Sequence, residues 1–190
     1  MRIISGSAKG RRLFSPADRS RDIRPTSDRA REALFSILGT KTKDSYVLDL
    51  FAGTGALGCE ALSRGAQFVT FVDISKKALA LVQQNISLIP MGEDRSRIIQ
   101  HDLRRSLPLS VDDISDDCLF DLVFADPPYR RGFTEKILHN LDNCSVLSDE
   151  VLVIVEEQKS IDLDINLKNL SLEDRRCYGD TSFSFFIRTN

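Results

Sequence analysis

Several features that define whole classes of protein are missing from this 190-residue sequence. No uninterrupted apolar run is longer than Val151–Val155, which is far too short to cross a membrane. The N-terminal residues contain no apolar stretch, so we expect no secretory signal. The four cysteines form no C-x-x-C pair, which predicts reduced thiols in a cytoplasmic protein and neither a zinc site nor a disulfide framework. What remains is the composition of a globular domain.

Positive charge is concentrated at the N-terminus. Residues 1–31 hold nine Lys or Arg against three Asp, a balance of +6, and because the whole chain carries −2 the remainder carries −8. Only this segment is suited to a polyanion. We therefore predict a basic arm over residues 1–25 and a main domain over 26–190, with anion contacts from Lys9, Arg11, Arg12, Arg21 and Arg24. A solvated tail that binds nothing is the alternative.

Strand-like and helix-like segments alternate from residue 46 onward. Apolar runs typical of buried strands occupy 46–51, 67–73, 97–102, 118–126 and 150–157. Helical patterns occupy 55–65, 76–89 and 133–141, and an earlier helix capped by Thr26 or Ser27 ends at Gly39. Two short strands open the chain, and a hairpin turning at Gly179 closes it. This alternation predicts an α/β fold with a doubly wound, mostly parallel sheet.

Four carboxylates lie at or next to the ends of predicted strands, namely Asp49, Asp73, Asp102 and Asp126. In a doubly wound sheet, ligands bind beyond the carboxyl ends of the strands, at the point where the strand order reverses. We therefore expect these four side chains to gather along one edge and to form a ligand site.

The sequence GTGALG, residues 53–58, satisfies the dinucleotide fingerprint G-x-G-x-x-G, and Asp73 follows at a distance suited to a ribose. A nicotinamide-dependent oxidoreductase is one alternative, and a tight turn that binds nothing is another. Asp49 adds a second carboxylate close to the loop, which would repel a pyrophosphate and attract a cation. S-adenosylmethionine carries an ammonium and a sulfonium but no phosphate, so it fits these charges better.

Each candidate residue receives a role on this hypothesis. Gly53 and Gly55 let the backbone approach the cofactor closely. Asp73 accepts both ribose hydroxyls, and Asp102 accepts the adenine amino group. Asp49 faces the positive methionine end, either directly or through backbone and water. No metal ion is expected.

The sequence DLVFADPPY, residues 121–129, runs from a buried strand into a carboxylate and two prolines. The prolines end the strand and keep the turn rigid. Asp126 and the Pro127 carbonyl can accept hydrogen bonds from the two N–H groups of an exocyclic amine, and Tyr129 offers a ring face to a base. The pattern predicts methyl transfer to such an amine.

These motifs resemble the RsmD-type family of bacterial small-subunit ribosomal RNA guanine-N2 methyltransferases. The similarity extends over RIISGSAKGRRL and RPTSDRAREALFSIL near the N-terminus, VLDLFAGTGALGCEALSRGA and DLVFADPPY in the core, and YGDTSFSFF near the end. It implies a seven-stranded Rossmann-like class I methyltransferase with an antiparallel C-terminal hairpin and a small N-terminal hairpin extension. Asp73 departs from the longer Glu of many members.

The resemblance also implies a substrate and partners. We expect S-adenosylmethionine-dependent methylation of a guanine N2 amine, small-subunit ribosomal RNA or the small subunit itself as partner, and a monomer that binds no membrane. The core motifs are shared with methyltransferases that act on adenine or cytosine in DNA and on protein glutamine, so these activities stay open as alternatives beside the oxidoreductase.

Overall fold

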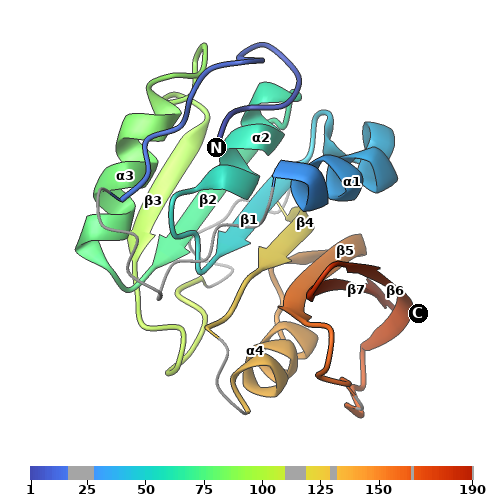
Figure 1. Ribbon diagram of the computed structural model, residues 1–190. Coiled ribbons are helices and arrows are strands. Elements are labelled where there is room, and N and C mark those ends of the chain that lie inside the picture. The colour runs from blue at the N-terminus through green and yellow to red at the C-terminus, as the bar shows by residue number, and fades with distance from the viewer. Residues whose placement is uncertain (17–27, 110–118, 129–131, 164, 190) are drawn as a thin grey trace.

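The structure, a computed structural model, describes residues 1–16, 28–109, 119–128, 132–163 and 165–189. The helices are α1 (Asp28–Leu38), the 3-10 helix η1 (Gly39–Thr42), α2 (Ala56–Ser63), α3 (Lys76–Ile86) and α4 (Phe133–Asp142). The strands are β1 (Tyr46–Leu50), β2 (Phe68–Asp73), β3 (Ser96–Gln100), β4 (Phe120–Ala125), β5 (Leu147–Gln158), β6 (Leu170–Tyr178) and β7 (Thr181–Arg188). Figure 1 shows their arrangement. The predicted caps of α1, Thr26 and Ser27, lie outside the described residues.

The seven strands form one sheet in the order β3-β2-β1-β4-β5-β7-β6. Strands β1 to β5 run parallel to one another, whereas β7 is antiparallel to both β5 and β6. The predicted fold class is therefore confirmed, including the closing hairpin, in which Gly179 turns with a φ of 64°. From β1 the chain proceeds outward to β2 and β3, then returns to β4 on the other side, so the strand order reverses between β1 and β4.

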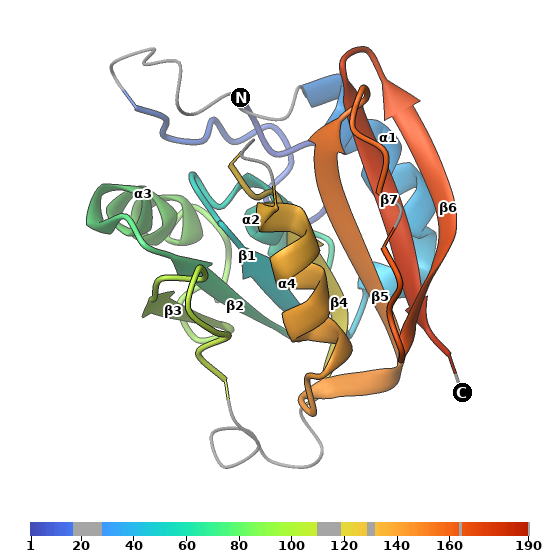
Figure 2. The ribbon, with the colours of Figure 1, turned by 90° about the horizontal axis from the view of Figure 1, so that it is seen from below.

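The two faces of the sheet bury separate apolar clusters. Phe71, Phe124 and Ile154 pack with residues of α1, α2 and α3 on one face. Val123 and Val153 pack with residues of α4 on the other. Figure 2 shows α4 in front of the sheet. Side chains alternate between the two faces along a strand. The carboxylates that lie two residues after Phe71, Phe124 and Ile154 are therefore on the same face as these three residues, the face that α1, α2 and α3 cover.

The two predicted N-terminal strands are reduced to a single antiparallel bridge between Arg2 and Arg12. Two further backbone N–H groups of the segment donate to α2 instead of to the opposite half of the segment. The N–H groups of Ile4 and Ser5 donate to the buried carboxylate of Glu60 on α2, at 2.7 and 3.0 Å. The segment is thus held both by α2 and by backbone hydrogen bonds of its own, such as those from Ile3 N–H to the Arg11 carbonyl and from Leu13 N–H to the Met1 carbonyl, at 2.9 and 3.2 Å.

The described part of the basic arm shares the main hydrophobic core. Ile3, Ala8 and Leu13 are buried in the cluster that contains α2. Ser7 N–H donates to the carbonyl of Ser63, the last residue of α2, at 2.7 Å. Residues 1–16 therefore pack on the domain, while the division at residue 25 falls outside the described residues and stays a prediction.

In the described part of the chain, no helix is long and apolar enough to span a membrane. The same residues contain no group of three or more His, Cys, Asp or Glu that could hold a metal ion. Cys59, Cys144 and Cys177 are free thiols, and Cys118 lies outside the described residues.

Candidate active site

The four predicted aspartates lie where β1 to β4 end. Asp73 is the last residue of β2, and Asp49 is the last but one of β1. Asp126 follows β4, and its N–H donates to the carbonyl of the last residue of β1 at 3.4 Å. Asp102 follows β3, and the residue before it donates to the Asp73 carbonyl at 3.0 Å. We call these strand ends and the loops that follow them the carboxyl edge; it contains the reversal between β1 and β4.

The loop that joins β1 to α2 turns through a left-handed backbone. The φ angles are 60° at Phe51, 55° at Gly53 and 71° at Gly55. The glycines adopt this conformation without a Cβ penalty, but Phe51 does not, and such strain persists only where the surroundings impose it. The Phe51 ring meets Phe133 at the start of α4, edge-on, with 5.4 Å between ring centroids. The strained residue thus ties the glycine loop to α4.

Asp73 joins the glycine loop to α3. Its Oδ2 accepts from Gly53 N–H at 2.9 Å and its Oδ1 accepts from Ser75 N–H at 2.8 Å. A carboxylate has about four acceptor positions, so each oxygen can still accept a hydroxyl donor. Ser75 caps α3 as predicted, because its hydroxyl accepts from Ala78 N–H at 3.3 Å. The arrangement suits the predicted contact with ribose hydroxyls.

Asp49 is buried beneath α2. Its Oδ2 accepts from Gly58 N–H at 2.9 Å, and a Cβ at Gly58 would lie 2.3 Å from the ring of Phe71. The third glycine therefore allows α2 to pack closely on the sheet. Burial raises the pKa of Asp49 to about 8, with Gly58 N–H opposing and the charge of Asp73 adding to the shift. Asp49 therefore holds the start of α2 through Gly58, and a nearby cation would favour its ionised form.

A cavity of about 240 Å³ opens at the carboxyl edge. Its lining is mostly apolar, with Phe51, Ile74, Leu103, Pro128 and Phe133 beside His101, Asp102 and Arg104. Sequence reasoning missed the apolar members. The available signal was Ile74, an apolar residue between a strand-end carboxylate and a helix cap, whose side chain is half exposed. The lining suits a flat, largely apolar ring with a polar edge.

Asp102 lines this cavity but is engaged by a neighbour. Its two oxygens accept from Nε and Nη2 of Arg104, both at 2.7 Å, and Arg105 Nε lies 3.8 Å away. The hydrogen bond from the Arg104 side chain lowers the pKa of Asp102 to about 2. An adenine amino group at Asp102 would therefore share the carboxylate with an arginine.

Asp126 lies in an environment of other carboxylates. Its pKa is raised well above the ordinary value by burial first, and then by the charges of Glu156, Asp49 and Glu157. Glu156 is its neighbour in the sheet, because the preceding residues of β4 and β5, Ala125 and Val155, are register partners. Sequence reasoning missed Glu156, although it too is an acid near the carboxyl end of a buried strand.

The rest of the DPPY motif is described in part. Pro127 is buried, and Pro128 is exposed at the cavity. Tyr129 lies outside the described residues. On α4, Thr134 donates its hydroxyl to Glu157 at 2.7 Å. The motif and the start of α4 are therefore parts of one carboxylate-rich corner.

The predicted anion-binding residues are separated from this corner. Lys9 and Arg12 are exposed in the N-terminal turn, and Arg11 donates to the carbonyl of Leu88, just beyond the end of α3. Arg21 and Arg24 lie outside the described residues.

The parallel sheet closed by an antiparallel hairpin, the glycine loop and the strand-end carboxylates define the chain as a class I methyltransferase fold. The family model described as Conserved hypothetical protein 95 matches residues 1–187. The chain belongs to this family, as the motifs predicted.

Three similar proteins illustrate the match. Ribosomal RNA small subunit methyltransferase D of Escherichia coli is 33% identical over 191 residues, covering 99% of this chain and 90% of that protein. The structure of yhhF, a methyltransferase candidate of E. coli, is 30% identical, with a TM-score of 0.80 over 99% of this chain and 97% of that one. SMU.776, solved with S-adenosylhomocysteine, is 18% identical with a TM-score of 0.62, covers 86% of this chain and 50% of that one, and shows the fold alone.

Proposed function

We propose that this protein transfers a methyl group from S-adenosylmethionine to the N2 amine of a guanine in small-subunit ribosomal RNA. The observation that carries the proposal is the position of Asp126. It lies at the reversal of strand order, beside an apolar cavity, and the described groups that shift its pKa are themselves carboxylates. Such a site favours a ligand that brings N–H donors and positive charge.

The residues present fit the cofactor. The cavity would hold the adenine, with Asp102 near its amino group and His101 on the wall. Asp73, already fixed by Gly53 and Ser75, would hold the ribose hydroxyls. When bound, S-adenosylmethionine supplies a methyl group on a sulfonium, and its positive charge favours the ionised form of the buried Asp49.

Asp126 and the Pro127 carbonyl would hold the acceptor amine. The lone pair of an exocyclic amine is conjugated with the base, so two fixed acceptors that bind its N–H groups turn the nitrogen toward a tetrahedral geometry. The same acceptors stabilise the positive charge that develops on the nitrogen, because they are already oriented before the transfer. The raised pKa of Asp126 also makes it a suitable acceptor for the proton that the methylated amine releases.

The choice of ribosomal RNA rests on the relatives. A relative that covers nearly the whole chain, including the N-terminal residues, is named for ribosomal RNA of the small subunit. Methyltransferases that act on DNA or on protein glutamine share only the core motifs with this chain. Asp126 stands where glutamine methyltransferases usually carry Asn. A nicotinamide-dependent reaction gives no role to Asp126. A monomeric state and a cytoplasmic location stay predictions.

The direct test uses small ribosomal subunits from cells that lack the gene. Incubation with the purified protein and S-adenosylmethionine should produce one N2-methylguanosine per particle, detected by mass analysis of nuclease fragments. Asp126→Ala serves as the inactive control. Methylation of adenine or cytosine in DNA, or of a glutamine in a protein, with ribosomal RNA unchanged, would contradict the proposal.

A further inference from the structure

The basic residues of the N-terminal turn lie near the C-terminal ends of helices α2 and α3. Helices α2 and α3 begin at the carboxyl edge, and the turn contacts their far ends, at Ser63 and Leu88. With a rise of 1.5 Å per residue, Ser63 and Leu88 lie roughly 10 and 18 Å along the chain direction from the starts of α2 and α3. Asn85, near the end of α3, links Phe14 to the carbonyl of Thr54 in the glycine loop, so the N-terminal segment approaches the site there by its backbone and not by Lys9, Arg11 or Arg12.

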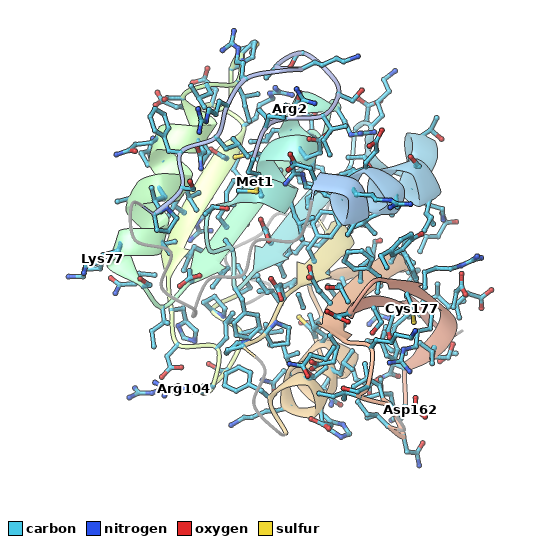
Figure 3. The ribbon with its side chains drawn as sticks, in the orientation of Figure 1. Met1, Arg2, Lys77, Arg104, Asp162 and Cys177 are labelled. Atoms are coloured by element: carbon cyan, nitrogen blue, oxygen red, sulfur yellow. The ribbon has the colours of Figure 1, made fainter. Side chains whose placement is uncertain are left out.

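A second group of cations lies at the carboxyl edge itself. Lys76 and Lys77 open α3 and are exposed. Arg104 and Arg105 follow β3, with side chains 60% and 83% exposed. In Figure 3 Lys77 and Arg104 lie toward the edge at which β1 and β2 end, whereas Arg2 lies toward the opposite end. We call these four residues the basic rim.

The two halves of the basic rim are joined at the cavity. Gln100, the last residue of β3, donates its side-chain amide to the Ile74 carbonyl at 3.2 Å, so the turn after β3 lies against the start of α3. Both Ile74 and Arg104 line the cavity. Asp102 holds the Arg104 guanidinium in place through two hydrogen bonds. Arg104 therefore lies at the cavity, and the other three cations lie at the start of α3 and in the turn after β3, on the same edge of the sheet.

We infer that the basic rim binds the phosphate backbone of the RNA next to the methylated nucleotide. This inference rests on the proposed function and adds to it the surface that holds the substrate near the cavity. A base presented to Asp126 stays linked to its own phosphates, and both Asp126 and the basic rim lie at the carboxyl edge of the sheet. Exposed Lys and Arg neutralise such phosphates and fix the register of the strand without reading its sequence.

The charge count along the sequence concealed this surface. The residues after the N-terminal segment sum to −8, but that sum includes acids buried under α2 and acids at the ends of β4 and β5. The fold separates these acids from the exposed cations at the starts of α3 and of the turn after β3. Local charge, and not the sum, decides where a polyanion binds.

The test compares three double variants of the full-length protein. Lys77→Ala with Arg105→Ala removes two cations of the rim and spares Arg104, which lines the cavity. Arg11→Ala with Arg12→Ala removes two cations of the N-terminal turn. Lys41→Ala with Lys168→Ala is the matched control, because both residues are exposed and lie near the opposite ends of the strands.

Binding to deproteinised small-subunit ribosomal RNA and to intact small subunits is measured at several salt concentrations, together with KM and kcat for methylation of the subunits. The rim variant should flatten the slope of log affinity against log salt by about 1.4–1.8, two contacts at 0.7–0.9 each. It should raise KM for the subunit at least tenfold, while the affinity for S-adenosylhomocysteine stays unchanged. The control should match the parent.

A rim variant with the salt slope and KM of the control would overturn the inference while the parent still methylates the subunit. Failure of the proposed function looks different, because the parent itself would then leave the subunit unmethylated. A turn variant that lowers affinity without changing KM would place the N-terminal cations in general RNA binding, away from the target nucleotide.

Discussion

Two aspartates, the half-buried Asp126 and the buried Asp142, lie toward opposite ends of the sheet and have their pKa values shifted in opposite directions. Asp142 ends α4, far from the cavity, and its oxygens accept from the N–H groups of Lys168, Asn169 and Leu170 at 2.7–2.9 Å. Burial alone would raise the pKa of Asp142, but these three donors lower it below the ordinary value. At Asp126 burial and the neighbouring carboxylates act in the same direction and raise the pKa.

The contrast separates a structural acid from a functional one. Asp142 is surrounded by donors that the fold supplies, so its charge stabilises the native state. Among the described residues, the charged groups that act on Asp126 are acids, an arrangement that costs stability and is typical of sites that bind a ligand. A ligand with N–H donors and positive charge offsets that cost. We therefore expect substitution of Asp126 to change activity and substitution of Asp142 to change stability.

The largest effect is expected for Asp126→Ala. Turnover should fall by roughly two to three powers of ten, the scale on which one preorganised electrostatic partner contributes. Binding of S-adenosylhomocysteine, measured by calorimetry, should stay near the parent value. Asp126→Asn keeps the shape and one acceptor but loses the charge, so it should fall between the parent and the alanine variant. An alanine variant that binds the cofactor poorly would assign Asp126 to the cofactor site instead.

Asp142→Ala should change stability and leave the chemistry intact. The loss of an acceptor for three backbone donors should lower the free energy of unfolding by about 3 kcal/mol, as measured in denaturant titrations. Because the folded-state pKa of Asp142 is lowered, its contribution is present above the unfolded pKa of about 4 and is lost as pH falls through the folded value. Asp142→Asn should flatten stability against pH in this acidic range. Unchanged acid sensitivity would argue against the role of the charge.

Asp73→Ala should weaken cofactor binding by roughly ten- to a hundredfold, the range for lost hydrogen bonds to a charged group. Ribose contacts persist from the ground state to the transition state, so the single-turnover rate at saturating cofactor should change little. Asp73→Asn keeps an acceptor for the Gly53 or Ser75 N–H and serves as the control. A large loss of single-turnover rate at saturation would show that Asp73 acts in the chemical step.

The smallest effect is expected for Glu156→Gln, which removes one of the charges that raise the pKa of Asp126. Asp126 must be ionised to hold the amine, so methylation rises with pH as its proton leaves. Removal of the neighbouring charge lowers that pKa and should shift the rising limb of the single-turnover profile to lower pH. An unshifted limb, in a variant that folds normally, would mean that Glu156 does not act on Asp126.

The sequence was sufficient to predict the fold class and the position of four aspartates at one edge of the sheet. Continuous apolar runs and strand-end acids are local signals, and the resemblance to a known family implied the same fold. Sequence reasoning did not identify Ile74, Phe133 and Glu156, because their place in the site depends on which elements are neighbours in space. Nothing local indicates that β4 and β5 pair so that Glu156 lies beside Asp126.

The N-terminal segment shows the opposite failure. Its charge was evident, but the charge gave no indication that Glu60 and Ser63 would bind its backbone and hold it against the far ends of α2 and α3. Likewise, Asp49 was recognised as an acid near the loop, while its burial and its pKa of about 8 follow only from the close packing that Gly58 permits. Long-range packing decides these properties, and sequence spacing does not encode it.

The central claim is that Asp126 holds the acceptor amine during methyl transfer and that Asp142 has no part in it. It is tested most directly by single-turnover methylation of small ribosomal subunits, at saturating S-adenosylmethionine and at a temperature where both alanine variants are folded. The account predicts that Asp126→Ala loses at least a hundredfold in rate while Asp142→Ala keeps the parent rate. Equal rates for Asp126→Ala and the parent would contradict it.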